Sequence, residues 1–373
     1  MLLDIRPHRA PVAALHETPP ARAHRPTWDR PGWLRGALAA AACFGVIAFI
    51  LGAGNRLTQG PWFIYAPEVS YVPPFGRAAW QHAFVLHQQS PLYALCGGYE
   101  VGGMESITIY KFLYWWEWFR YASAVLFVVS LFVAAGLLLR REANAARRRD
   151  LMPWIGLIAA GLGYFVLRYF ADHAGLFATI NLGQHRHALD IAFASVGLAM
   201  LIVAAMAPQP WAGPALPRVA WGSVIALDIA FGALFEALDA GPLWTSFPGY
   251  TGSLLPTADR LFALHPLWRN LTENGYLVQA CHRMLSIGLW AAALVAVATA
   301  MLRGVSRTRA LVLFGLLTLE GALGIAALRP GAAVVLSIAH QVGAIAVLAA
   351  ALAPREPRGA HRRAGEQFVP REA

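Results

Sequence analysis

The stretch YWWEWFRYASAVLFVVSLFVAAGLLL, residues 114–139, indicates a membrane protein, because after its first turns it is a long apolar run without charge. A helix needs about 20 mainly apolar residues to cross the hydrocarbon core of a bilayer. The first turns differ from the rest, since they combine aromatic side chains with Glu117 and Arg120. A second stretch, LVQACHRMLS at residues 277–286, begins another apolar run and has a glutamine and His282 at the same spacing.

The composition of the whole chain is that of a membrane protein. Of 373 residues, 58% are hydrophobic and 13% are charged, and the mean hydropathy is +0.50. A soluble domain usually contains about 25% charged residues. The net charge of +10 comes from arginines in tails and loops between apolar runs, so it indicates membrane topology and not a nucleic-acid partner. The three cysteines form no CxxC or CxxCH motif, which excludes a zinc ribbon and covalent c-type haem attachment.

The apolar runs predict an all-α membrane protein that spans the bilayer eight times. Twenty arginines lie on the side of both chain ends, whereas the opposite loops contain seven basic residues over more sequence. The positive-inside rule therefore places both termini in the cytoplasm and the long loops 54–111 and 240–276 outside. The predicted transmembrane helices cover about residues 34–53, 114–139, 152–171, 187–207, 217–239, 277–302, 308–328 and 331–353.

The chain also looks duplicated. The stretches ILGAGNRLTQGPW (50–62) and LFEALDAGPLW (234–244) each end an apolar run and each precede a long outer loop. Internal repeats of this kind are common in membrane proteins, and a four-helix unit can hold a cofactor in its core. We therefore predict a disordered cytoplasmic tail (1–33), two pseudo-symmetric four-helix bundles (34–207 and 217–353) and a second cytoplasmic tail (354–373).

Ionisable side chains within membrane spans are costly, so they mark candidate functional sites. His282 lies about five residues into its helix, and His340 lies about nine residues into another helix that enters the membrane from the same side. At a rise of about 1.5 Å per residue, their depths in the membrane differ by about 6 Å. Two neutral imidazoles at similar depth can ligate a haem iron from opposite faces. Two separate hydrogen bonds between helices are the alternative.

The first half has different side chains at the corresponding positions. Glu117 and Arg120 are three residues apart and share a helix face, and Asp190 in GQHRHALDIA (183–192) lies near the position that matches the second histidine. An arginine has no acceptor atom for iron. Arg120 would pair with Asp190 or with Glu117. His187, three residues before Asp190, is the histidine that would replace a missing ligand.

Taken together, these stretches resemble the haem A synthase family over about residues 36–352. The resemblance is strongest in the second half and rests on motifs that are specific in combination. They are GALFEALDAGPLWTSFP (232–248), WRNLTENGYLVQACHRML (268–285), LEGALGIAAL (319–328) and AHQVGA (339–344), with ILGAGNRLTQG (50–60), HQQSPLY (87–93) and KFLYWWEW (111–118) in the first half.

The resemblance implies an eight-helix pair of bundles and an activity, the oxidation of a haem O methyl group to a formyl group that yields haem A for terminal oxidases. In that family one bundle holds a bis-histidine haem b that passes electrons. The other receives the substrate haem through an E-x-x-H motif and a second histidine. On this chain His282 and His340 match the haem b ligands, and Glu117 matches the glutamate that acts at the reacting methyl group.

The first half departs from the family pattern, because Arg120 and Asp190 replace its other two histidines and Tyr121 replaces an arginine. Three interpretations stay open. A haem A synthase would hold its substrate through the propionates, which Arg120 can pair in a bidentate manner, with help from His187 and with Glu117 as the catalytic residue. A family member with one haem b would have its first site closed by an Arg120–Asp190 pair and would act in electron transfer or oxidase assembly. An enzyme with the same haem b would act on a quinone-like substrate.

The implied partners are haem O, the synthase that supplies it, an electron donor that the sequence does not name, and the lipid bilayer; an oligomer is compatible with the sequence. The preference for arginine over lysine and the high alanine content are typical of a bacterium with a GC-rich genome. We therefore expect an integral protein of a bacterial plasma membrane with its long loops outside.

Overall fold

The computed structural model describes residues 32–57, 69–70, 72–89, 107–140, 183–206, 216–250, 253, 255–304, 307–329, 331 and 334–353. Within these residues the secondary structure is helical apart from one isolated bridge. Seven of the described helices are long and apolar enough to cross a membrane. They are α1 (Gly32–Leu57), α5 (Ile107–Leu139), α7 (Gly183–Met206), α8 (Leu216–Ala237), α11 (Gly275–Leu302), α12 (Thr308–Ala327) and α13 (Val334–Leu352).

The prediction of an all-α membrane protein is therefore confirmed for the described residues. Seven of the eight predicted spans coincide with these helices, and the span predicted at 152–171 lies outside the described residues. The duplication of the chain into two similar bundles stays a prediction.

Helix α5 begins at Ile107, well before the predicted start at residue 114. The extra turns pack against the short helix α3 (Arg77–Gln88), where the ring of Trp80 contacts the rings of Tyr110 and Tyr114. Lys111, which the sequence places at the end of the outer loop 54–111, lies 5.4 Å from the Trp80 ring centre as a cation–π partner. Tertiary packing thus extends the helix beyond the span that hydropathy predicts.

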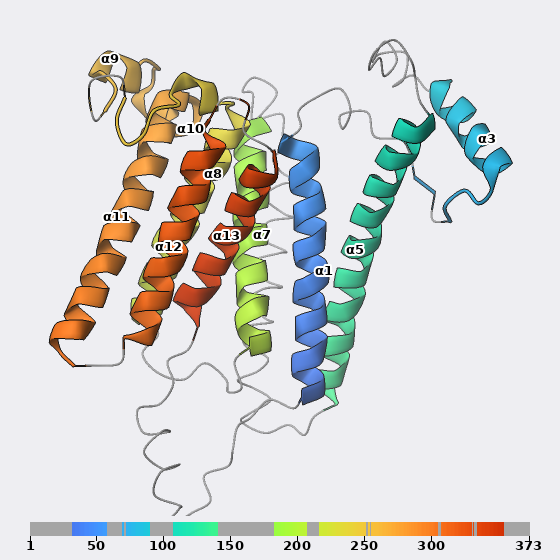
Figure 1. Ribbon diagram of the computed structural model, residues 1–373, viewed down its shortest axis with the longest axis horizontal. Coiled ribbons are helices and arrows are strands. Elements are labelled where there is room, and N and C mark those ends of the chain that lie inside the picture. Colours follow the sequence, from blue (N-terminus) through green and yellow to red (C-terminus); the bar gives the residue numbers. More distant parts are fainter. Residues whose placement is uncertain are drawn as a thin grey trace, which may run out of the picture.

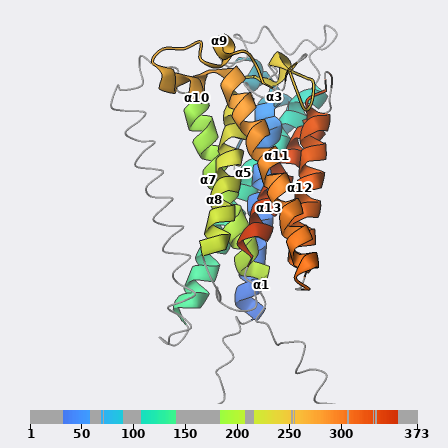
Figure 2. The ribbon, with the colours of Figure 1, turned by 90° about the vertical axis from the view of Figure 1, so that its left-hand side faces the viewer.

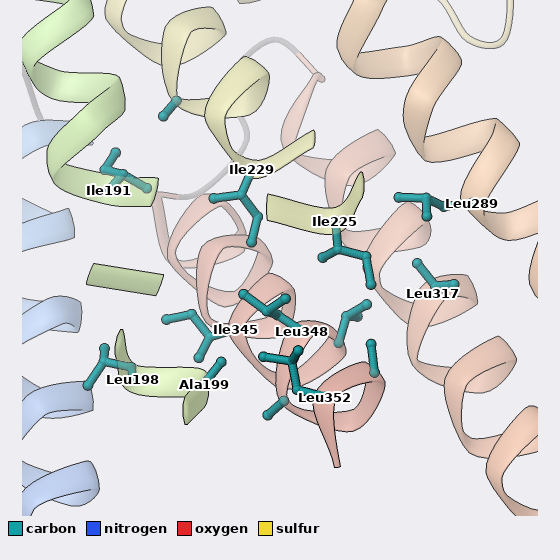
Figure 3. Close-up of a cluster of buried hydrophobic side chains, with 14 of the residues drawn as sticks. Ile191, Leu198, Ala199, Ile225, Ile229, Leu289, Leu317, Ile345, Leu348 and Leu352 are labelled. Atoms are coloured by element: carbon teal, nitrogen blue, oxygen red, sulfur yellow. The ribbon is translucent and has the colours of Figure 1, made fainter. Parts of the chain in front are cut away.

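The four helices of the second half pack around a shared core (Figures 1 and 2). Helix α7 lies against α8 and α13, and α1 lies between α7 and α5. Buried side chains recur at helical spacing along α8 and α13. Figure 3 shows this core, which includes Ile191 and Leu198 of α7, Ile225 and Ile229 of α8, Leu289 of α11, Leu317 of α12, and Ile345, Leu348 and Leu352 of α13.

Small residues allow close approach where helices meet, as is common in membranes because lipid tails are as apolar as the core. A Cβ atom on Gly45 of α1 would lie within 3.0 Å of the Phe127 ring of α5 and closer still to Leu198 of α7. A larger residue there would require the side chains of Leu198 and Phe127 to move.

Helix α1 begins and α13 ends at the same end of the molecule, the lower end in Figure 1. Arginines at this end cap helix C-termini, whose last carbonyls lack partners within the helix. Arg309 donates to the carbonyl oxygens of Ala351 and Ala353, both at 2.6 Å, and Arg35 donates to that of Ala205 at 3.2 Å. Some of the arginines that predicted the topology therefore also stabilise the helix ends.

The opposite end has a set of short elements between α8 and α11. They are η1 (Gly241–Leu243), α9 (Ala258–Leu261), η2 (Leu267–Arg269) and α10 (Asn270–Glu273). Two buried asparagines organise them. Asn270 binds the backbone of Leu264 through both its oxygen and its nitrogen, and Asn274 accepts from the Tyr276 amide at 2.9 Å as the N-cap of α11. This cap fixes the start of α11 and so the position of every side chain along it.

Candidate functional site

The structure brings the two histidines of the second half together. His282 extends from α11 and His340 from α13, and their ring centres lie 6.3 Å apart with ring planes inclined at 71°. Both rings are largely buried. The rings therefore lie at similar depth, as the sequence predicts, and helix packing brings them side by side.

Each imidazole is held through its Nδ1 atom. In His282 this atom lies 2.8 Å from Oδ1 of Asp228 and 3.2 Å from the Asp228 carbonyl oxygen. In His340 it lies 3.2 Å from the carbonyl oxygen of Glu320 and 3.0 Å from the carboxylate atom Oε1. Carbonyl and carboxylate oxygens only accept hydrogen bonds, so the hydrogen of each neutral ring belongs on Nδ1. The lone pair on Nε2 is then available to bind a metal.

The same local pattern surrounds both rings. Asp228 and Gly232 are four residues apart on α8, and Glu320 and Gly324 are four residues apart on α12. A Cβ atom on Gly232 would lie 3.1 Å from Cε1 of His282, and one on Gly324 would lie 2.9 Å from Cε1 of His340. The carboxylate of Asp228 orients His282, the backbone carbonyl of Glu320 orients His340, and each glycine leaves room for the ring.

A third glycine completes the surroundings of Glu320. Gly343, three residues after His340 on α13, lies so close to the Glu320 carboxylate that any Cβ there would collide with it. Ser286 of α11 donates to Oδ2 of Asp228 at 2.8 Å, so both oxygens of that carboxylate have partners. Close packing or hydrogen bonds thus fix the position of each carboxylate.

Sequence reasoning missed Asp228 and Glu320, although the signal was present. They occur in LDIAFG (227–232) and LEGALG (319–324), two acid-x-x-x-glycine motifs inside predicted spans. A carboxylate within a span is costly and needs a partner. The two motifs lie far from the histidines in sequence, so only the helix packing reveals the partners.

The two histidines fit a haem. A metal about 2 Å from each of two imidazole nitrogens separates the ring centres by about 6 Å, which agrees with the observed 6.3 Å. Among the described residues, no group of three or more His, Cys, Asp or Glu side chains could hold a bare metal ion. A haem needs only axial ligands from the protein, because the porphyrin supplies the others.

Hydrogen bonds connect the segment after α8 to α11, next to His282 in sequence. Gln279 donates to the carbonyl oxygen of Trp244 at 3.1 Å, and Arg283 donates to those of Trp244 and Ser246, both at 2.8 Å. The guanidinium also lies 4.9 Å from the ring centre of Tyr250. Burial raises the pKa of Tyr250, which the Arg283 charge partly opposes, so the phenol stays neutral.

In the first half, Glu117 and Arg120 form an ion pair on α5. The guanidinium lies 2.6 Å from Oε2 of Glu117, and Arg120 also lies 4.2 Å from the ring centre of Tyr121. The side chain of Glu117 is 4% exposed and that of Arg120 31%. Of the two predicted partners of Arg120, the described residues thus show Glu117, and the Arg120–Asp190 pair stays a prediction.

His187 has a partner in the second half of the chain. Its Nε2 atom on α7 is 3.4 Å from Oε1 of Glu236 on α8, and Gln341 of α13 donates to the other oxygen of Glu236 at 2.7 Å. Glu236 is another acid within a span that sequence reasoning missed. His187 therefore connects the first half to the second, and its role as a replacement ligand stays a prediction. Asp190 follows it one turn later on α7.

Comparison with known proteins shows which family the chain resembles. Residues 36–352 match the sequence model COX15-CtaA, described as cytochrome oxidase assembly protein. The chain is similar to the haem A synthase of Azorhizobium caulinodans, with 31% identity over 330 residues that cover 84% of this chain and 91% of that protein. It is also similar to the haem A synthase of Rhodopseudomonas palustris strain BisA53, with 31% identity over 343 residues that cover 88% and 91%. No solved structure matches the chain significantly.

Proposed function

Because the chain belongs to the COX15-CtaA family of cytochrome oxidase assembly proteins, we propose that it is a membrane oxidoreductase of haem A synthase type. Its substrate is haem O, and the reaction converts a methyl group of that haem to a formyl group. The observation that carries this proposal is the pair of imidazoles of His282 and His340, 6.3 Å apart and each held at Nδ1. Relatives named haem A synthase support the same role.

In this proposal the second half is the electron-transfer half. Haem b supplies reversible one-electron transfer when it is bound between the histidines. His282 and His340 would hold this haem through their Nε2 lone pairs, and the hydrogen bonds at Nδ1 fix the orientation of both rings. Phe235 of α8 stacks beside His282, with ring centres 6.2 Å apart.

The first half receives the substrate. Arg120 offers a bidentate partner for a propionate of haem O, and Glu117 beside it holds or releases a proton at its buried carboxylate. Neither side chain ligates iron in this proposal. The substrate haem is therefore held by its propionates and by apolar contacts, whereas haem b is held through its iron.

A second candidate function is a family member with a single haem b that transfers electrons or assists oxidase assembly without oxidising haem O. One observation favours it. Glu117 is bound to Arg120 at 2.6 Å, so the carboxylate that would act on the substrate is already neutralised by a cation. A quinone-like substrate has no observation in its favour among the described residues.

The haem content of the purified protein decides between these functions. The chain is expressed with a haem O synthase, purified in detergent, and analysed by pyridine haemochrome and by chromatography of the extracted haems. Haem b together with haem A or partly oxidised haem O supports the synthase. One haem b per chain and no other haem supports the second candidate, and the absence of haem b overturns both. His340→Ala is the matched control that should lose haem b alone.

The double variant Arg120→His with Asp190→His tests the first half directly. Imidazoles at these positions replace two side chains that do not ligate haem iron. If the first half still has room for a haem, a second haem should appear in the purified double variant. Its continued absence would count against a haem-sized site in the first half.

A further inference from the structure

We propose that Asp228 and Glu320 are positioning residues that lower the reduction potential of the haem b held by His282 and His340. This inference rests on the proposed function, because it assumes that the two imidazoles are axial ligands. It goes beyond that function by assigning a role to two acids on α8 and α12 that touch the ligands and not the iron.

The physical basis is electron donation through the ring. A carboxylate that accepts the Nδ1 hydrogen draws that proton toward itself, which makes the Nε2 lone pair a stronger donor to iron. Ferric iron gains more from a strong donor than ferrous iron does, because it carries one more positive charge. The equilibrium Fe(III) plus one electron to Fe(II) then shifts toward Fe(III), with no covalent bond formed or broken in the protein.

A carboxylate lies beside the Nδ1 atom of each ligand ring, and that of Asp228 accepts its hydrogen bond. Asp228 lies 2.8 Å from Nδ1 of His282, and Glu320 lies 3.0 Å from Nδ1 of His340. Both carboxylates are shielded from solvent, with side chains 14% and 12% exposed. A low surrounding dielectric strengthens their interaction with each ring and with the metal.

The two sides are not equal. Asp228 makes a hydrogen bond to His282 through its carboxylate, and Ser286 fixes its other oxygen at 2.8 Å. The hydrogen bond of His340 is directed at the Glu320 carbonyl oxygen at 3.2 Å, while the carboxylate lies near without that alignment. We therefore expect the larger contribution to the potential from Asp228.

The test uses isosteric variants of the full-length protein. Asp228→Asn and Glu320→Gln keep an oxygen near Nδ1 but remove the negative charge. Purified proteins are analysed for haem b per chain, and the haem is then titrated between its two redox states by optical potentiometry. We expect Asp228→Asn to raise the potential by about 59 mV, which corresponds to a tenfold change in a one-electron equilibrium. A smaller rise is expected for Glu320→Gln.

The matched control is Glu236→Gln. Glu236 lies two turns beyond Asp228 on α8 and contacts His187 and Gln341. This control removes the same charge from the same helix. A rise as large as that of Asp228→Asn would overturn the inference, because the effect would then come from overall charge and not from the ligand hydrogen bond.

The outcomes separate this inference from the proposed function. Wild-type protein without haem b removes the proposed function. Wild-type protein with haem b, whose potential is unchanged in both Asp228→Asn and Glu320→Gln, overturns the inference and leaves the function standing. If Asp228→Asn fails to retain haem, Glu320→Gln decides, since His340 keeps its contact with the Glu320 carbonyl oxygen at 3.2 Å.

Discussion

Replacement of Gly324 by alanine should displace His340 and weaken haem binding. The new Cβ would lie 2.9 Å from Cε1 of the imidazole, whereas ordinary van der Waals contact begins at 3.4 Å. The ring must therefore move by about 0.5 Å, the difference between these distances. The Nδ1 atom, now 3.2 Å from the Glu320 carbonyl oxygen, would then exceed hydrogen-bonding distance.

The expected magnitude follows from this displacement. Metal–ligand distances tolerate deviations of about 0.2 Å, and the loss of an orienting partner costs about 10–100-fold in affinity. We expect haem b affinity to fall within that range. Overpacking costs about 1–3 kcal/mol of stability, which the gain of about 1 kcal/mol from glycine to alanine in a helix offsets in part.

The assay measures haem b per chain during a competition with apomyoglobin, together with the thermal unfolding of the detergent-solubilised protein. Gly321→Ala on the same helix is the control, because a Cβ there meets nothing within 4 Å. It should retain haem b and unfold at the same or a slightly higher temperature. Retention of haem b by Gly324→Ala at the wild-type level would refute the assigned position of the His340 ring.

Three further predictions concern other parts of the chain. Glu117→Gln should leave the haem b spectrum intact and abolish oxidation of haem O, and normal product formation would show that Glu117 is not catalytic. Arg283→Gln removes two charged hydrogen bonds to the carbonyls of Trp244 and Ser246, each worth about 1.5–3 kcal/mol; limited proteolysis should cut the segment after α8 faster, and an unchanged cleavage rate would contradict this role. Asn274→Ala removes the N-cap of α11 and should lower the free energy of unfolding by about 1 kcal/mol or more, measured by denaturant titration; an equal value in both proteins would be contrary evidence.

The partner of Arg120 illustrates how far sequence reasoning reaches. The spacing of Glu117 and Arg120 permits a pair on one helix face, and the match to Asp190 permits a pair between helices. The sequence therefore permits both pairs and does not choose between them. The structure shows the local pair at 2.6 Å, and the pair between helices stays a prediction.

The acids of the second half illustrate the opposite case. Asp228 and Glu320 were visible as charged residues inside apolar runs, which is enough to predict that each has a partner. The identity of that partner was not visible. Asp228 and His282 are 54 residues apart, and no periodicity within one helix relates them.

The sequence by itself determined that this is a helical membrane protein, because apolar runs of this length leave the backbone no partner in lipid except the helix itself. It also determined that His282 and His340 lie at similar depth, because helical rise converts residue number into distance along the membrane normal. Only the tertiary structure decided which side chains meet across helices, such as Asp228 with His282 and His187 with Glu236. Those contacts depend on how each helix is rotated and packed against its neighbours, and interactions along one helix do not specify that rotation.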